Sequence, residues 1–478
     1  MKIVLITPNT GRVERLESKA AWPPLGLFYI ATVLQESAHE VTVINNSRIQ
    51  LPLRDFVKRV KREDPQVIGI SALTPTFRQG IKFAHAIKEE LPEVKIVFGN
   101  YHSTFTYDRI LETYPNEVDY VVLGDGEQTF LELVETLENE GEVKKVKGIA
   151  FRQNGEIIET PQRLFDKDIS ELPIPDRSLL EEEYYSELMG LIGSAGNFTT
   201  MVTSRGCPFN CKFCACSAFT RRQVRFRSPE DVVNEMELLQ ERGYEEIGFV
   251  DDNLLLDKRR IKKICALMRE REIELNFWAE GRVDQASQEV LSDLASVGCK
   301  TIYFGMESGL QSVLDYFGKS TTPELSRRAV KNSRKAGIEN IIGSFIVGAP
   351  IETAADVRKT FDFIMETKGI DFPQVNVLFL SPGMDFWDMA VEGGYLDEER
   401  AWQDPVAAVD VFPSHLKKDE VEEMIDNFYK EFIMRPGYIA SELGRTLVSS
   451  YRLKILKANI EAGISFGSLG EFLWGGSK

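Results

Sequence analysis

Residues 203–214 read Thr-Ser-Arg-Gly-Cys-Pro-Phe-Asn-Cys-Lys-Phe-Cys, and they place Cys207, Cys211 and Cys214 within eight positions. The chain has only six cysteines among 478 residues, which is no disulfide framework. Cysteine clusters of this kind in reducing compartments are more often metal-binding or catalytic. The apolar run at 199–203 predicts a strand, so the three cysteines follow it on a short loop.

The spacing of these cysteines suits an iron–sulfur cluster. Three thiolates bind three irons of a [4Fe-4S] cluster, and the fourth iron stays open to a chelating small molecule, by the logic of an open catalytic zinc site. Structural zinc is a weaker alternative, because it needs four ligands and no histidine lies nearby. Cys216 is a candidate fourth ligand at a tight offset, whereas we interpret Cys265 and Cys299 as small buried hydrophobic residues.

The N-terminal third alternates strand-like and helix-like segments. Strands that alternate with helices predict parallel βαβ units in a doubly wound, Rossmann-like sheet. The short apolar runs are 2–6, 41–44, 67–71, 94–99 and 120–124, and the amphipathic stretches of helical length include 24–34, 78–91 and 127–140.

Three loops at the ends of these strands carry glycines, hydroxyls and other polar groups. Ligands on doubly wound sheets bind at such strand ends, although each loop taken alone is also ordinary turn chemistry. The candidate ligand contacts are Ser71, Leu73, Thr74, Gly99, Tyr101, His102, Ser103, Gly124, Asp125, Gly126 and Glu127.

The segment after this sheet predicts a domain junction. Residues 143–165 alternate like a small β-hairpin that turns at Asn154-Gly155. Pro173 and Pro175 then interrupt regular structure. We place the domain boundary between 170 and 195.

Charge and hydropathy exclude some partners. The net formal charge is −17, and an acidic surface repels phosphate backbones, so we expect no nucleic-acid partner. We expect no transmembrane segment and no secretory signal, and therefore a cytoplasmic protein. Residues 205–227 are the local exception, with six Arg or Lys and no Asp or Glu, and this charge would help to hold an anionic cluster.

Two features resemble a known family. The three-cysteine motif, with Phe213 immediately before its last cysteine, is similar to the signature of radical S-adenosylmethionine (SAM) enzymes. The N-terminal third, with residues 23–27 (Pro-Pro-Leu-Gly-Leu) and 124–127 (Gly-Asp-Gly-Glu), resembles the cobalamin-binding domain fused to one large class of them. This class lacks the Asp-x-His-x-x-Gly loop of some corrinoid proteins, as does this chain, so we interpret His102 as a pocket residue rather than a cobalt ligand.

The resemblance implies a partial (β/α)6 barrel with the cluster at its mouth. Six apolar runs fit its strands, at 199–203, 246–250, 274–278, 301–305, 341–348 and 375–380. Polar residues at their ends are where barrel chemistry lies; Arg282 would pair with the SAM carboxylate, and the ends of the fourth and fifth strands would bind ribose and adenine. The cofactor-binding candidates of this region are Phe213, Asp251, Glu280, Arg282, Glu307, Ser308, Gly348 and Pro350.

We therefore predict an α/β protein of four parts. They are a Rossmann-like cobalamin-binding domain at 1–145, a hairpin and linker at 146–195, a radical SAM partial barrel at 196–395 and a helical region at 396–478. Within the last part, 420–432 and 446–460 are predicted helices, and the chain from Phe466 onward is predicted to be a flexible tail.

The resemblance also implies the reaction. The open iron would chelate SAM, and one electron would cleave it to a 5′-deoxyadenosyl radical that abstracts hydrogen from an unactivated carbon. With cobalamin, the substrate radical can take a methyl group, so cobalamin-dependent C-methylation is the leading hypothesis. A cyclising, ring-forming or carbon–carbon-coupling radical SAM enzyme, with or without cobalamin, is the alternative, and an iron–sulfur electron carrier or redox sensor is a third. Lipid, tetrapyrrole, peptide and other small-molecule substrates all stay open, and a flavodoxin or ferredoxin would supply the electron.

Overall fold

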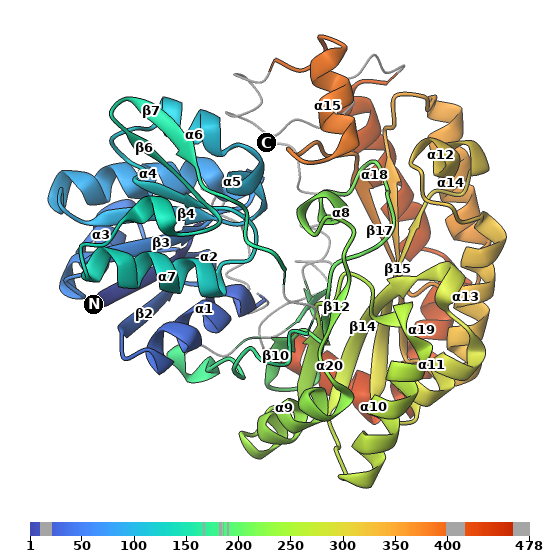
Figure 1. The fold of residues 1–478 in the computed structure, drawn as a ribbon. Helices are drawn as coiled ribbons and strands as arrows, with labels where there is room; N and C mark the ends of the chain where they lie inside the picture. The colour runs from blue at the N-terminus through green and yellow to red at the C-terminus, as the bar shows by residue number, and fades with distance from the viewer. Residues whose placement is uncertain are drawn as a thin grey trace.

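Two largely parallel sheets, one from each half of the chain, dominate the fold (Figure 1). The structure is a computed structural model, and it describes residues 1–9, 22–165, 168–180, 184, 186–188, 191–397 and 416–461. The predicted flexible tail lies outside the described residues. None of the described helices is both long and apolar enough to span a bilayer.

The N-terminal sheet has the order β2-β1-β3-β4-β5-β6-β7. Its first five strands are parallel, as the alternating pattern predicts, and the last two are antiparallel. The strands are β1 (Lys2–Thr7), β2 (Glu40–Asn45), β3 (Val67–Ser71), β4 (Lys95–Gly99), β5 (Tyr120–Val122), β6 (Ile149–Gln153) and β7 (Glu156–Glu159).

Helices cover both faces of this sheet. Val4 and Ile6 of β1 belong to one hydrophobic core, while Ile3 and Leu5 belong to the core on the opposite face. This is why β1 reads as a continuous apolar run. The helices are α1 (Leu25–Glu36), α2 (Asn46–Ile49), α3 (Leu53–Arg62), α4 (Thr74–Glu90), α5 (Tyr101–Phe105), α6 (Tyr107–Thr113) and α7 (Glu127–Glu138).

Two local features differ from the sequence-based prediction. Helix α4 begins at Thr74 instead of residue 78, because Pro75 suits a first turn and the Thr76 hydroxyl accepts a hydrogen bond from the Leu73 N–H. The hairpin β6–β7 turns at Asn154 and Gly155, both with positive φ. It extends the N-terminal sheet and is not part of a free linker.

The second sheet is the six-stranded parallel partial barrel, in the order β10-β13-β14-β15-β16-β17. Its outer face packs against the surrounding helices in one large hydrophobic core. The strands are β10 (Phe198–Met201), β13 (Glu246–Phe249), β14 (Asn276–Arg282), β15 (Cys299–Glu307), β16 (Asn340–Val347) and β17 (Phe372–Val377). The helices are α9 (Pro229–Glu241), α10 (Lys258–Glu270), α11 (Gln288–Ala295), α12 (Gln311–Tyr316), α13 (Pro323–Ala336) and α14 (Ala354–Glu366).

Two strands of the barrel reach further than their apolar runs. β14 includes Glu280 and Arg282, and β15 includes Glu307. These polar residues therefore stand on the strands themselves and not on the loops behind them. A small antiparallel ribbon, β11 (Ser204–Arg205) with β12 (Arg225–Phe226), and helix α8 (Cys216–Phe219) lie between the two sheets (Figure 1).

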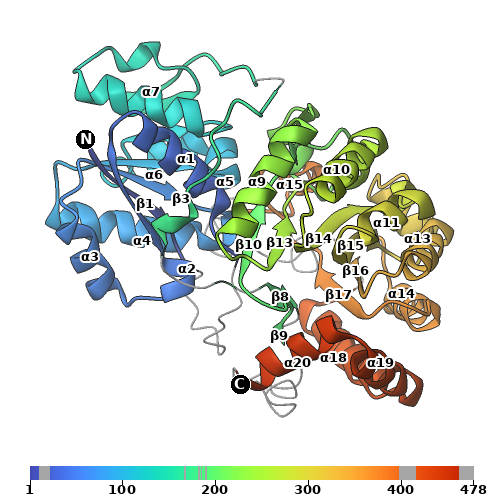
Figure 2. The ribbon, with the colours of Figure 1, turned by 90° about the horizontal axis from the view of Figure 1, so that it is seen from below.

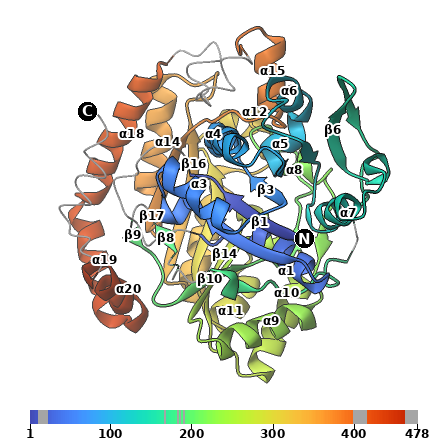
Figure 3. The same ribbon diagram turned by 90° about the vertical axis from the view of Figure 1, so that its left-hand side faces the viewer.

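The C-terminal helices pack along one edge of the barrel. Figures 2 and 3 both show α18 (Lys418–Ile433), α19 (Pro436–Val448) and α20 (Ser450–Glu461) beside β17 and α14, while α15 (Asp385–Glu392) lies apart from them. Phe428 of α18 stacks on Phe361 of α14, with ring centres 4.5 Å apart. The predicted helix at 420–432 lies within α18, but the single helix predicted at 446–460 is wrong. The chain breaks at Ser449 into α19 and α20.

Candidate active site

The cysteine loop leads from β11 into α8 and lies at the mouth of the barrel. Its three cysteines are each partly exposed. Gly206, with φ of +95°, begins the loop, and a Cβ there would lie 2.0 Å from the carbonyl oxygen of Gln223, so only glycine fits. The Gly206 N–H donates to the Asp252 carboxylate at 2.7 Å. The loop is thereby fixed to the end of β13.

Positive side chains face the three thiols. Burial raises the pKa of Cys207 and of Cys211, and the charge of Cys214 raises both further. Lys319 and Arg282 act in the opposite direction on Cys211, whose Sγ lies 3.9 Å from Nη1 of Arg282. Thiols bind metal as thiolates, so the two cations offset charge that an iron–sulfur cluster would bring. The donor set fits a [4Fe-4S] cluster with one open iron.

Cys216 has a different environment from the other three. It is buried in α8, and its hydrogen bond to Cys214 lowers the pKa of the Cys214 thiol to about 7. Cys216 therefore supports a candidate ligand instead of extending the set to four. Within the described ranges, no three His, Cys, Asp or Glu side chains converge as one metal ion would require; a cluster binds each thiolate to a separate iron. Cys265 and Cys299 are buried in the outer core of the barrel, as predicted.

The ends of β14 and β15 reach the cysteine loop. The Arg282 guanidinium lies 3.7 Å from the centre of the Phe209 ring and donates to the carbonyl oxygen of Lys319 at 2.8 Å. The Lys319 ammonium donates to Glu307 at 2.7 Å and lies 5.7 Å from the centre of the Phe213 ring. The sequence did not single out Lys319, because it follows α12 in a segment without a motif.

The ends of β15 and β16, the fourth and fifth barrel strands, complete the rim at the mouth of the barrel. Ser308 follows β15 directly and is fully buried. Gly348 follows β16 with φ of +86° and begins a tight turn that contains Pro350. The Glu352 carboxyl group closes the turn by accepting a hydrogen bond from the Ala349 N–H at 2.7 Å, and burial raises its pKa to about 7.

Asp251 lies beneath the rim and does not face it. Its carboxylate accepts hydrogen bonds from the Thr203 N–H at 3.0 Å, the Thr203 hydroxyl at 2.6 Å and the Ser204 hydroxyl at 2.6 Å. Asp251 thus holds the connection between β10 and the cysteine loop, and the neighbouring Asp252 is the residue that reaches the cavity described next.

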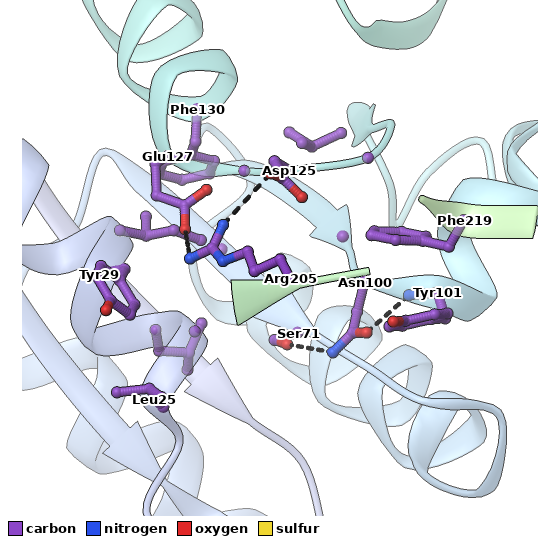
Figure 4. A pocket seen from close by; sticks show the side chains of 18 of the residues that line it. Leu25, Tyr29, Ser71, Asn100, Tyr101, Asp125, Glu127, Phe130, Arg205 and Phe219 are labelled. Atoms are coloured by element: carbon purple, nitrogen blue, oxygen red, sulfur yellow. Dashed lines mark hydrogen bonds and ion pairs between the residues drawn. The ribbon is translucent and has the colours of Figure 1, made fainter. Parts of the chain in front are cut away.

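A cavity of about 360 Å³ lies between the N-terminal strand ends and the mouth of the barrel (Figure 4). The predicted ligand contacts that line it are Ser71, Gly99, Tyr101, Gly124, Asp125, Gly126 and Glu127. Further lining residues, absent from the predicted contacts, are Tyr29, Asn100, Phe130, Arg205, Phe219, Arg225 and Asp252. The Gly-Asn pair at 99–100 marks Asn100 as a loop residue at a strand end, and its φ is +84°. No local sequence pattern indicates that Tyr29 or Phe219 lines the cavity.

The other predicted contacts do not line this cavity. His102 is buried, its Nδ1 lies 3.1 Å from the Thr74 hydroxyl, and burial lowers its pKa to about 3. The Thr74 hydroxyl also lies 2.8 Å from that of Ser381, beyond β17. Ser103 is fully buried, and Leu73 is exposed. His102 and Thr74 therefore belong to the contact between the two halves.

A network of charges crosses the cavity (Figure 4). Arg205 donates to Glu127 at 2.6 Å and to Asp125 at 3.3 Å, and Arg225 also donates to Asp125. The Arg205 guanidinium lies 5.1 Å from the centre of the Tyr29 ring. Because Arg205 stands two residues before the first cysteine, the network joins the cysteine loop to the N-terminal domain.

The cavity wall fits a broad, flat ligand such as a corrinoid. A Cβ at Gly26 would meet no atom within 4 Å, and one at Gly99 would meet nothing nearer than 3.9 Å, so both glycines leave the wall open. Tyr101 and Phe219, one from each half of the chain, stack with ring centres 4.1 Å apart. Bare backbone and flat aromatic faces are surfaces on which a large planar cofactor packs.

Comparisons with known proteins match both halves of the chain. Residues 11–134 match the B12 binding domain, and residues 201–364 match the radical SAM superfamily. An uncharacterized methyltransferase of Pyrococcus horikoshii is 32% identical over 449 residues, which cover 93% of this chain and 95% of that protein.

Two further proteins extend the comparison. An anaerobic magnesium-protoporphyrin IX monomethyl ester cyclase of Rubrivivax gelatinosus is 26% identical over 504 residues, covering 99% of this chain and 86% of that protein. The solved structure of the radical SAM methyltransferase TsrM from Kitasatospora setae shares the fold with a TM-score of 0.69 at 19% identity, covering 82% of this chain and 76% of that chain.

The fold and the site thus define a radical SAM enzyme whose barrel faces a second cofactor domain. The chain belongs to the family of cobalamin-dependent radical SAM enzymes. This confirms the predicted fold class, the predicted family and the predicted cofactors, which are a [4Fe-4S] cluster, SAM and cobalamin.

Proposed function

We propose that the protein is a cobalamin-dependent radical SAM C-methyltransferase that acts on a small molecule. The observation that carries this proposal is that the cysteine loop lies against the cavity at the ends of the N-terminal strands. Arg205 and Asp252 both line the cavity, while Arg205 precedes the first cysteine by two residues and Asp252 binds the Gly206 N–H. The two proposed cofactor sites therefore lie next to each other, as transfer of a methyl group to a substrate radical requires.

Each cofactor has its own set of proposed contacts. Cys207, Cys211 and Cys214 would hold the cluster, and Arg282 would bind the SAM carboxylate as a planar fork. Ser308, Gly348 and Pro350 would contact the rest of SAM along the rim. The cavity-lining candidates from the N-terminal domain would hold cobalamin, and these are Ser71, Gly99, Tyr101, Gly124, Asp125, Gly126 and Glu127.

The cofactors supply the difficult chemistry, radical formation by the cluster with SAM and a methyl group by cobalamin. The chain orients these groups and excludes water from between them. Tyr101 and Phe219 pack together across the two halves, and Arg205 joins the halves again by binding Glu127 and Asp125. These contacts at the junction of the two halves would help to keep water away from a reactive carbon radical.

The relatives favour methyl transfer and supply one alternative. The 32% identical relative is described as a methyltransferase, whereas the relative from Rubrivivax gelatinosus forms a ring. A radical SAM cyclase is therefore the second candidate function. For either reaction we propose a flavodoxin or ferredoxin as electron donor.

Product analysis separates the two candidates. The anaerobically reconstituted enzyme, loaded with hydroxocobalamin, is incubated with a reductant and SAM labelled with deuterium in its methyl group. Methylation consumes one SAM as radical source and another as methyl source, so we expect both 5′-deoxyadenosine and S-adenosylhomocysteine, with the label passing to the corrinoid fraction. 5′-Deoxyadenosine without S-adenosylhomocysteine or label transfer would overturn methylation and favour the cyclase.

A further inference from the structure

The interior of the partial barrel holds a carboxyl group that the cofactor contacts leave unused. Glu280 lies on β14 two residues before Arg282. Residues two apart on a strand share one face and lie about 6.6 Å apart. Since Arg282 contacts Cys211, Glu280 lies one step deeper in the barrel, below the cluster loop.

An aromatic floor lies below Glu280. Trp278, two residues earlier on the same face of β14, forms an edge-to-face pair with Trp22 at 6.0 Å. Tyr303 is the register partner of Glu280 on β15. Trp22, Trp278, Tyr303 and Phe372 cluster around Ile342. Trp22 comes from the segment before α1, so the N-terminal half contributes to the inside of the barrel.

The Glu280 carboxylate has no cation to balance it. In the part of the chain that the structure describes, no residue forms a hydrogen bond or ion pair with it. Burial raises its pKa to about 7, and the charges of Asp252 and Asp251 act in the same direction. The nearby cations are engaged elsewhere, since Lys319 binds Glu307 and Arg282 binds Asp284.

We propose that Glu280 and the aromatic floor form a substrate subsite for a protonated amine carried on an aromatic or flat apolar body. A bound ammonium would restore the missing counter-charge through a charge-assisted hydrogen bond, and the ring of Tyr303, which is only partly buried, would attract the same charge. The inference rests on the proposed function in taking the barrel interior, below SAM, as the chamber for the substrate.

This assignment differs from the one that the family resemblance implies. The resemblance places Glu280 among the SAM contacts, in which case its loss would weaken SAM binding. A substrate subsite predicts that SAM affinity stays unchanged and that only affinity for the amine is lost. The two assignments are therefore distinguished by which ligand responds to the same substitution.

The test uses the full-length protein with its cluster and saturating SAM. Calorimetry measures the affinity of phenethylamine, of the neutral phenethyl alcohol and of the anionic 3-phenylpropanoate. We expect the amine to bind at least about tenfold more tightly than the alcohol, and the carboxylate to bind weakest. Glu280→Gln removes the preference for the amine and leaves SAM affinity within about twofold, because the amide keeps the shape and loses the charge.

A control variant distinguishes loss of the subsite from a general loss of negative charge on the protein surface. Glu289→Gln removes an exposed carboxylate that pairs with Lys262, and it should bind phenethylamine like the unsubstituted protein. If Glu280→Gln fails to fold, the affinities of the three probes for the unsubstituted protein still test whether the subsite prefers an amine. The subsite would be overturned if the amine and the alcohol bound with equal affinity, or if both variants lost the same amount of amine affinity. Loss of SAM binding in Glu280→Gln would overturn it as well. If the subsite is overturned but the unsubstituted protein still forms S-adenosylhomocysteine, the methyltransferase proposal stands.

Discussion

At the scale of single residues, the cysteine loop depends on one glycine. Gly206 has φ of +95°, and a Cβ there would lie 2.0 Å from a carbonyl oxygen of the backbone. Gly206→Ala should therefore lower the free energy of unfolding by more than the about 1–2 kcal/mol that a left-handed alanine costs by itself. Gly155→Ala is the matched control, since Gly155 has φ of +87° and open space around it. Equal losses in denaturant titrations of the two variants would contradict the prediction.

The role of each cysteine can be tested at the same scale. Cys214→Ser should lower bound iron to about a tenth after reconstitution, because serine is a poor ligand for a cluster iron. Cys216→Ala should keep its iron, since Cys216 donates a hydrogen bond to Cys214 and is not a member of the ligand set. Iron and sulfide analysis measures both. Loss of iron in Cys216→Ala would instead make Cys216 a fourth ligand.

At the scale of elements, the ribbon β11–β12 joins the cluster loop to the cobalamin domain through the Arg205 network. Glu127→Gln removes the charge that Arg205 binds at 2.6 Å. We expect hydroxocobalamin to bind about tenfold more weakly, or about 1.4 kcal/mol, with the iron content unchanged. Glu132→Gln, on the same helix but paired with Arg163, should bind it normally. Unchanged affinity in Glu127→Gln would show that the network does not shape the cavity.

The elements also show what the sequence could predict. Buried strands are continuous apolar runs, and helices carry apolar residues at helical spacing. Both sheets and most helices could therefore be predicted from the order of apolar and polar residues. The break at Ser449 was missed because apolar residues continue through it. His102 was expected in the pocket because it follows a strand end; α5 begins one residue earlier and buries it against Thr74.

At the scale of the whole molecule, the missed parts of the site are contacts between distant segments. Trp22 lies inside the barrel against Trp278, and Arg205 binds side chains about 80 positions away in the chain. Lys319 binds Glu307 at the barrel rim. Local patterns place each of these residues on an element, but a single sequence does not give the packing of two domains, which decides their partners. The cysteines and strand-end glycines were found because their chemistry is local.

At the end of the barrel far from the cysteine loop, a buried acid holds the last described helix, α20. Glu246 is fully buried and accepts hydrogen bonds from Tyr451 of α20 at 2.8 Å and from the indole N–H of Trp278 at 2.6 Å. Burial raises its pKa from 4.5 to about 7. A pKa that is higher in the folded state gives stability that is fully present below pH 4.5 and is lost as pH rises to about 7.

We therefore expect the free energy of unfolding to fall by up to about 3 kcal/mol across that window because of Glu246, at 1.36 kcal/mol for each unit of pKa shift. Glu246→Gln cannot titrate, so its stability relative to the unsubstituted protein should rise between pH 4.5 and 7 and stay level above it. Denaturant titrations of both proteins at several pH values measure this difference. A difference independent of pH would show that folding does not shift the pKa of Glu246. Arg445 and Arg452, which pair with Asp371, would then be the charged contacts that hold α19 and α20.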